Sequence, residues 1–333
     1  RNLDIGSVYI ESHYKTSTSS LGIFVTINTA NSFEILNING GINYGYDDPT
    51  MDVFFKMDKV PSALFEVLAT DIVSNLEGTV SSDVRLNGSF NEPRMSGWVS
   101  LNEAKAHIDY LGTTYAMQDT FALNSKGIHF DNLMLTDARG EKAFVNGKIV
   151  HENMSRFDLD LDMTADNFTL LNTTEKDNDL YYGQLYATGT ARFEGPMLKA
   201  KVSCDLETEE NTRFYLPIQE DQGYSQESFI RFIDVEGEKS EYEVADNDFS
   251  LDLYINMNTK AETQLIFDKQ LGDIIKATGD GRINLSLSPS GEFQMFGDYI
   301  IDNGNYLFTA FDLINKRFEI ERGSKVSWIG SPY

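Results

Sequence analysis

Apolar and polar residues alternate along most of this chain, and Gly, Asn, Asp and Pro separate the alternating runs. Between Phe157 and Met163, four apolar residues alternate with three aspartates, and the run from Phe249 to Met257 repeats the pattern. Successive side chains of a β-strand point to opposite faces, so a period of two predicts strands with one apolar face. The turn residues between the runs predict hairpins. The sequence therefore predicts an all-β chain of strands joined by hairpins.

One segment departs from this period. Residues 61–76 carry apolar side chains at helical spacing, with Pro61 suited to a first turn and Gly78 suited to a stop. The pattern predicts a short amphipathic helix near 61–76, with its apolar stripe at Leu64, Phe65, Leu68, Ile72 and Leu76. The helix has no Lys or Arg to favour a membrane interface, so we expect it to pack on the sheet.

The chain is long enough for two or more compact domains, or for one elongated all-β unit. The pattern predicts a strand segment at 1–60, the helix at 61–77 and continuous strands at 78–333. Two loose repeats, at 80–93 and 185–196, each run through a strand into Phe-x-x-Pro, as in stacked strands that stabilise their neighbours. Both ends interrupt strand-like runs, which we interpret as a fragment of a longer protein.

Composition excludes some partners. The chain has 52 acidic and 27 basic residues, and its formal charge of −25 repels a nucleic-acid backbone and disfavours an anionic membrane surface. The single cysteine, Cys204, allows no internal disulfide and no four-thiolate metal site. No apolar run reaches the length of a membrane-spanning helix, and no signal peptide is visible.

Catalytic motifs are missing from the sequence, so we expect neither an enzyme nor a cofactor. Nucleophile-elbow, zinc-protease, phosphate-loop and dinucleotide fingerprints do not occur. Asp158, Asp160 and Asp162 have the opening spacing of a calcium loop, but Met163 stands where the loop needs Gly. Period-two exposure on a strand explains these carboxylates. The histidines occur singly, at His13, His107, His129 and His151.

The apolar strand face is then the candidate site. It is either the core of a closed sandwich or barrel, or the lining of an open, U-shaped sheet that accepts acyl chains. Flexible Met and aromatic Phe side chains suit a hydrocarbon guest and a core equally. The candidate lining residues are Leu159, Leu161, Met163, Leu251, Leu253, Ile255, Ile283, Leu285, Phe293 and Met295.

A series of turn motifs also occurs in order along the chain. It comprises Leu76–Val80, Asn87–Pro93, Asp137–Ala143, Tyr182–Tyr186, Phe214–Ile218, Phe267–Asp273, Gly297–Thr309, Phe318–Ser324 and Trp328–Pro332. Together these motifs resemble the periplasmic C-terminal part of TamB-like translocation and assembly module proteins, within the AsmA-like superfamily, as found in the Bacteroides type of bacterium. The C-terminal motif region of the family corresponds to residues 265–333.

The resemblance implies an elongated, curled, antiparallel-rich β-sheet with an apolar groove. It implies a periplasmic protein that is held at the inner membrane by an N-terminal anchor outside this chain and reaches an outer-membrane barrel protein of the TamA or BamA type. Passive phospholipid transport in outer-membrane biogenesis, with acyl chains in the groove, is the first function implied. The alternative is a scaffold for insertion of outer-membrane proteins, which offers its sheet edges or its groove to nascent strands by strand addition. A structural or adhesin-like spacer and a polysaccharide-cleaving enzyme complete the alternatives.

Overall fold

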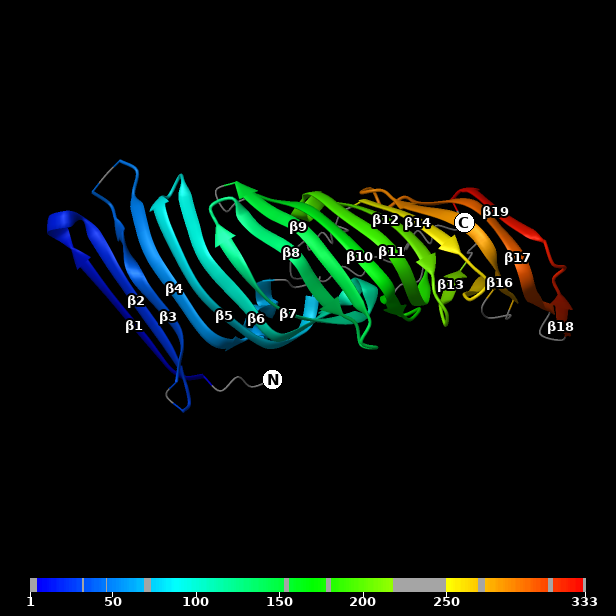
Figure 1. Ribbon diagram of the computed structural model, residues 1–333, viewed down its shortest axis with the longest axis horizontal. Helices are drawn as coiled ribbons and strands as arrows, with labels where there is room; N and C mark the ends of the chain where they lie inside the picture. The colour runs from blue at the N-terminus through cyan, green and yellow to red at the C-terminus, as the bar shows by residue number, and fades with distance from the viewer. Residues whose placement is uncertain are drawn as a thin grey trace, which may run out of the picture. The chain divides into compact units, whose positions relative to one another are not determined.

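The computed structural model describes residues 5–31, 33–45, 47–68, 73–152, 156–177, 181–217, 250–268, 273–310 and 314–331. Within these ranges the chain forms nineteen β-strands and four short 3-10 helices, with no α-helix (Figure 1). Most strand pairs are antiparallel. The fold class expected from the sequence is confirmed, because the chain is all-β and forms a long, curled, antiparallel-rich sheet.

Contacts divide the chain into two units. Unit 1 comprises residues 1–169 and 192–197, and unit 2 comprises residues 170–191 and 198–333. The boundaries expected from the sequence at 1–60 and 78–333 are drawn from residue patterns rather than from contacts, and they stay a prediction.

Unit 1 is a ladder in which each strand pairs antiparallel with the next strand along the chain. This order follows from the hairpin connections that the turn residues favour. Its strands are β1 (Ile5–Lys15), β2 (Ser20–Thr29), β3 (Glu34–Asn43), β4 (Thr50–Pro61), β5 (Val73–Ser89), β6 (Pro93–Ile108), β7 (Thr113–Asn124), β8 (Gly127–Thr136), β9 (Lys142–Glu152) and the first part of β10 (Arg156–Thr173). Three 3-10 helices accompany them: η1 (Thr16–Thr18), η2 (Ser62–Leu68) and η3 (Asp109–Leu111).

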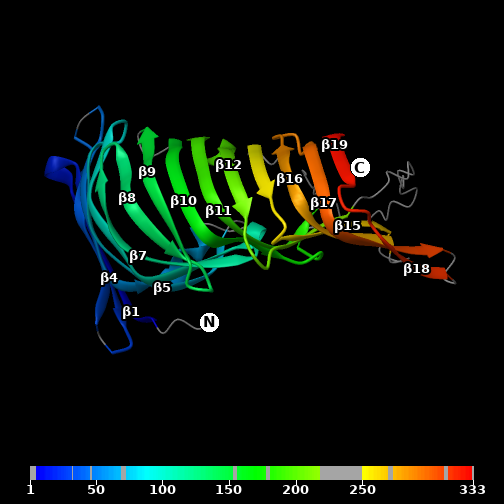
Figure 2. The ribbon, with the colours of Figure 1, turned by 45° about the vertical axis from the view of Figure 1, so that its right-hand side comes forward.

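Bulges bend this ladder. The register shifts in β4, β5, β6 and β8, and each shift contains a residue with positive φ: Lys59, Asn75, Glu103 and Asn132. A bulge adds a residue to one strand, bends that strand and increases its twist. Two of the four residues are Asn, which tolerates the left-handed region better than most side chains. Bulges on successive strands therefore curl the sheet across its strands (Figure 2).

The expected helix at 61–76 is wrong in type and length. The chain forms the 3-10 helix η2 at Ser62–Leu68, and Val73 to Leu76 already belong to β5. Val73 pairs with Ile108 of β6, so a ladder partner and a β-branched side chain outweigh the helical spacing of the apolar residues. Ile72, part of the expected stripe, lies outside the described residues.

Unit 2 contains interrupted strands. β12 pairs parallel with β14, β13 pairs parallel with β15, and β16 runs antiparallel past both β14 and β15. β17 pairs with β16 and, at its two ends, with β19 and β18. The elements are β11 (Tyr182–Pro196), η4 (Met197–Lys199), β12 (Lys201–Thr208), β13 (Arg213–Pro217), β14 (Ser250–Met257), β15 (Glu262–Asp268), β16 (Asp273–Leu287), β17 (Phe293–Ala310), β18 (Ile314–Glu319) and β19 (Lys325–Gly330).

The interruptions lie at one level of the sheet. Residues 209–212 separate β12 from β13, residues 258–261 separate β14 from β15, and the register of β16 with β17 shifts after Thr278. Polar groups are satisfied at the break: the Thr212 hydroxyl donates to the Tyr186 carbonyl (2.9 Å) and accepts from the Tyr186 N–H (3.1 Å). The break divides unit 2 into a first arm (β12, β14, β19 and the adjoining halves of β16 and β17) and a second arm (β13, β15, β18 and the other halves).

A buried carboxylate holds a loop of unit 1. The Asp137 side chain is 1% exposed and accepts hydrogen bonds from the Arg139 and Glu141 N–H groups (2.8 and 2.9 Å) and from the Thr169 N–H (3.0 Å) and hydroxyl (2.5 Å). Burial acts to raise the pKa of Asp137, but the hydrogen bonds from Thr169, Glu141 and Arg139 outweigh burial and lower it. The ionised form therefore ties the β8–β9 turn to β10.

We predict that Asp137→Ala destabilises the chain by about 2 kcal/mol or more, because it leaves buried N–H groups unpaired. Urea-induced unfolding measures the change, with the exposed Asp131→Ala as the control. Because the pKa of Asp137 is lowered on folding, its contribution is present above the unfolded pKa of about 3.9 and is lost as pH falls through the folded pKa. An equal loss of stability in Asp131→Ala would contradict this role.

Candidate functional site

One apolar row crosses all ten strands of unit 1. Directly opposed residues of antiparallel strands share a face, so the register can be followed from strand to strand. The row runs through side chains that are apolar at every step except one glycine: Ile10, Val25, Ile38, Phe55, Val84, Gly97, Leu123, Ile128, Ile149 and Leu159. Neighbouring rows add further apolar residues to this face: Val8, Ile27, Leu36, Met57, Val53, Leu86, Met95, Val99 and Phe121.

The cover over this face increases from β1 to β7 and decreases again toward β10, where Ile149 and Leu159 are half-buried. Ile10 on β1 is 69% exposed, Val25 and Ile38 are half-buried, and Val84 and Leu123 are only 8% exposed. Apolar side chains at the N-terminal strands are therefore in reach of solvent, while those nearer β7 are packed. The unit 1 face is open at β1–β3, and this open part is called the open face below.

Leu159, Leu161 and Met163 lie on the apolar face of β10, as the sequence predicts. They oppose Ile149, Gly147 and Val145 of β9, and all three are half-buried. Their role as lipid lining stays a prediction.

The intervening aspartates lie on the opposite face of β10. Arg192 binds Asp162 (2.7 Å) and Asp160, and Lys148 lies 3.5 Å from Asp160. The hydrogen bond from Arg192 lowers the pKa of Asp160. Among the described residues no group of three potential ligands could hold a metal ion. Ion pairing across strands therefore accounts for Asp160 and Asp162 of this run.

The seven candidate residues of unit 2 also share one face, on the first arm. β14 and β16 oppose Leu253 to Leu285 and Ile255 to Ile283, and β17 opposes Met295 to Leu285. Leu251 and Phe293 both oppose Leu287, one from each side. Four of the seven are at most 5% exposed: Ile255, Ile283, Leu285 and Met295. Leu251, Leu253 and Phe293 are half-buried.

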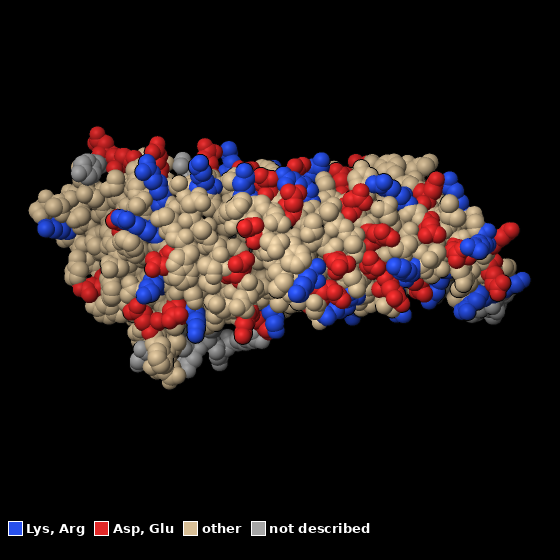
Figure 3. Space-filling view, viewed as in Figure 1, with Lys and Arg blue, Asp and Glu red and all other residues tan. Residues whose placement is uncertain are grey.

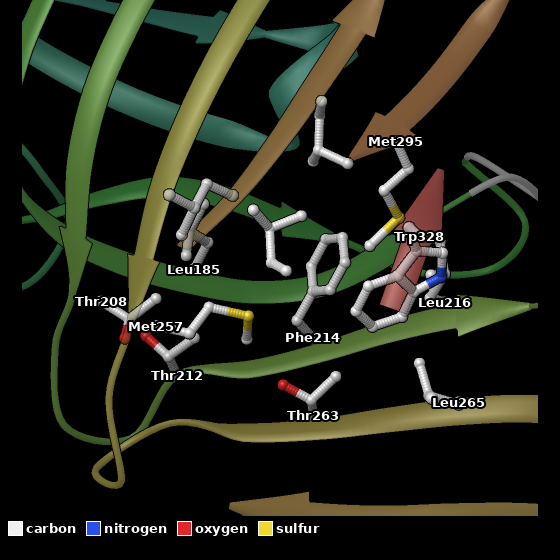
Figure 4. Close-up of a pocket in the computed structure, with 13 residues that line it drawn as sticks. Leu185, Thr208, Thr212, Phe214, Leu216, Met257, Thr263, Leu265, Met295 and Trp328 are labelled. Carbon is white, nitrogen blue, oxygen red and sulfur yellow. The ribbon is translucent and has the colours of Figure 1, made fainter. Parts of the chain in front are cut away.

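The second arm covers the buried part of this face. Phe214, Leu216 and Leu265 of the second arm line the same cavity as Met295 and Trp328 of the first arm, and Figure 4 shows Phe214 beside the Trp328 indole. The cavity measures only about 20 Å³, which is room for about one water molecule and not for an acyl chain. Here the apolar face is a filled core.

Trp328, Phe214 and Leu216 are core residues that the candidate set does not contain. Trp328 is 9% exposed on the short strand β19, and Leu216 is 1% exposed on β13. The alternation Phe214-Tyr-Leu216 was a usable signal, but nothing in the sequence places β13 opposite β16. The open face on β1–β3 is likewise outside the set, although its alternation is visible in the sequence.

Ionisable groups that could perform chemistry are dispersed. Burial raises the pKa of the Cys204 thiol to about 11, so it stays protonated at neutral pH. His13 contacts Glu11, and His107 lies 3.0 Å from the Thr114 hydroxyl. His107 also lies 4.0 Å from a carboxylate oxygen of Asp109, at the start of η3.

Charges of both signs are interspersed over the face of the molecule seen in Figure 3. The area over β1–β4 on this face carries few of them. In the part of the chain that the structure describes, no helix is long and apolar enough to cross a membrane.

Comparison with known proteins identifies a family. The family model described as the TamB C-terminal domain matches residues 131–333, which is more than half of the chain. Neither the curated proteins nor the solved structures contain a match.

We predict that Trp328→Ala destabilises unit 2 by about 3 to 5 kcal/mol, because truncation leaves a cavity between the two arms. Urea-induced unfolding followed by circular dichroism measures the loss. The matched control is Ile329→Ala on the same strand, where the side chain is 90% exposed and little change is expected. Equal effects of the two substitutions would show that Trp328 does not join the arms.

Proposed function

The chain belongs to the TamB family, and we propose that the open face of unit 1 binds phospholipid acyl chains. TamB proteins act in translocation and assembly, or in lipid transport, during outer-membrane biogenesis. They work with outer-membrane partners and span the periplasm. Within that role, passive phospholipid transport is the mechanism that an apolar strand face supports best.

The observation that carries the proposal is the apolar row from Ile10 to Leu159, which contains one glycine, is open to solvent at β1–β3 and is packed at Val84 and Leu123. Its nine strand pairings, at about 4.8 Å each, make a path of about 43 Å along the sheet. One leaflet of a bilayer contributes about half of a hydrocarbon core of roughly 30 Å. A phospholipid tail is therefore shorter than the row.

The binding energy suits a tail that moves along the face rather than one that is held at a single position. Each buried methylene contributes about 0.8 kcal/mol, wherever along the row it is buried. Adjacent positions on the open face are chemically alike, so a tail that slides between β1 and β3 exchanges similar contacts. Polar head groups stay in water at the open side. No hydrolysis and no cofactor are needed.

The candidate residues divide by burial. We assign the lining role to the half-buried residues Leu159, Leu161, Met163, Leu251, Leu253 and Phe293. Ile255, Ile283, Leu285 and Met295 form the core between the arms, and they would line a path only if the arms separated. A charge at Leu285 consequently tests folding of unit 2, whereas a charge on the open face tests lipid binding.

The proposed function places the chain between the two membranes of the cell envelope. We propose a non-catalytic segment in the periplasm, in a protein tied to the inner membrane through an N-terminal anchor. A barrel protein of the TamA or BamA type is the proposed partner at the outer membrane.

Strand addition is the second candidate function, and β1 favours it. β1 pairs with β2 alone among the described strands, and Val8, Ile10 and Tyr14 are 54%, 69% and 60% exposed. A strand with exposed apolar side chains can bind an extended segment of another protein. On this reading the cargo is an unfolded outer-membrane protein rather than a lipid.

We predict that Ile38→Asp lowers the phospholipid that co-purifies with the chain at least severalfold, because a carboxylate in the row must be desolvated by a bound tail. Native mass spectrometry after mild extraction measures the bound lipid. The matched control is Asn39→Asp, which places the same charge at the next residue of β3, on the opposite face of the sheet. Circular dichroism confirms that both variants fold.

Each outcome of this comparison is decisive. Loss of lipid in Ile38→Asp alone supports the proposal. Equal lipid in both variants, or none in the unsubstituted chain, overturns it. Bound unfolded outer-membrane protein in place of lipid supports strand addition, and neither ligand supports a structural spacer.

A further inference from the structure

The outer face of β2–β4, on the side of the sheet opposite the open face, is hollowed at a pair of glycines. Gly22 of β2 opposes Gly41 of β3, which in turn opposes Asp52 of β4. The next row on this face consists of Ser20, Asn43 and Thr50. All six residues line one cavity of about 270 Å³, on strands that lie side by side (Figure 1). This cavity is called the glycine hollow below.

The fold does not require glycine at position 22. A Cβ atom on Gly22 would lie 3.7 Å from the His13 carbonyl oxygen, which is an ordinary contact, and the backbone there is not left-handed. By contrast, a Cβ atom on Gly97 would lie 2.0 Å from the Asp83 carbonyl oxygen, and φ at Gly97 is +143°. Glycine weakens the interior of a strand and often marks the close approach of a ligand. The missing side chain at Gly22 therefore leaves room that the backbone does not need.

Polar side chains are held in place around the glycine hollow. Asp52 accepts two hydrogen bonds from Arg85, at 2.7 and 2.8 Å, and the Asn43 Oδ1 accepts one from the Gly45 N–H at 2.9 Å. A carboxylate has about four lone-pair sites, so Asp52 can accept further hydrogen bonds. Carboxylate, amide and hydroxyl groups thus offer donors and acceptors within a small area.

Aromatic rings flank the glycine hollow on the same face. Phe24 and Phe54 both oppose Asn39, in the row next to the one that contains Gly22. Phe54 is 43% exposed, and the Arg85 guanidinium lies 5.0 Å from its ring centroid. An exposed aromatic ring beside hydrogen-bonding groups offers an apolar surface and a polar one to the same ligand.

These features favour a neutral ligand of one ring. A peptide that binds by strand addition needs a free edge, whereas β2, β3 and β4 each pair on both sides. Among the described residues that line the hollow none is a cation, and the neighbouring Arg85 is bound to Asp52, so an anion is not favoured. The volume is just below the range of about 300–1,000 Å³ that is typical of small-molecule pockets.

We propose that the glycine hollow binds one neutral sugar ring of an oligosaccharide. A sugar ring has an apolar C–H surface, which packs against Phe54, and hydroxyl groups, which hydrogen-bond to Asp52 and Asn43. The open room at Gly22 admits the ring to the floor of the hollow. The inference goes beyond the proposed function, because the hollow and the open face lie on opposite faces of the same strands.

The test is isothermal titration calorimetry of the whole 333-residue chain with chitohexaose and maltohexaose, which are neutral oligosaccharides. Gly22→Val should lower the affinity about tenfold or more, because the new side chain occupies the hollow. Urea-induced unfolding should show equal or higher stability, because valine suits a strand better than glycine. The matched control is Asn37→Val, on the same face of β3 but away from the hollow. The control should bind like the unsubstituted chain.

A second variant tests the aromatic surface and does not depend on Gly22. Phe54→Leu should weaken binding about threefold to tenfold, because it removes the ring and keeps an apolar side chain. Its control is Trp98→Leu, which removes an exposed ring from the same face of β6. Absence of binding to both oligosaccharides by the unsubstituted chain overturns the proposal, as do equal losses in a variant and its control. None of these readouts uses lipid, so failure here is distinct from failure of the open-face proposal.

Discussion

The curl of the sheet depends on backbone irregularities that recur at a similar level in successive strands. In unit 1 these are bulges that contain Lys59, Asn75, Glu103 and Asn132, and in unit 2 they are complete breaks such as residues 209–212. A single bulge bends one strand, whereas a series of bulges bends the sheet. On β4 the apolar face passes from the odd-numbered Phe55 and Met57 to the even-numbered Val60, because the extra residue of the bulge shifts the alternation by one.

Burial of apolar area has different outcomes in the two units. In unit 2 the second arm meets the first, and side chains such as Ile283 and Trp328 fill the space between them. In unit 1 the side chains at β1–β3 keep much of their surface accessible, and that surface does not contribute to folding stability. Surface that is left uncovered is available to a ligand.

Local sequence predicted which side chains share a face of a strand, but not which of those side chains other strands bury. The alternation from Phe157 to Met163 assigned Leu159 and Leu161 to one side correctly, because a period of two depends only on neighbouring residues. It could not distinguish Leu253, half-buried, from Ile255, 5% exposed, because the covering residues come from β13 and β15. The prediction of a helix after Pro61 was wrong because it also depended on a distant partner. The pairing of Val73 with Ile108 outweighs the helical spacing of the apolar residues.

The pairing of each unit 1 strand with its chain neighbours has an evolutionary consequence. A hairpin of two strands can be duplicated or lost without changing the direction of the remaining strands or the face to which their side chains point. Only the two strands on either side of the change acquire a new partner. The span of such a protein can therefore adjust to the distance it must cover in a given cell envelope by whole hairpins. Loss of a single strand would instead reverse the direction of every strand beyond it.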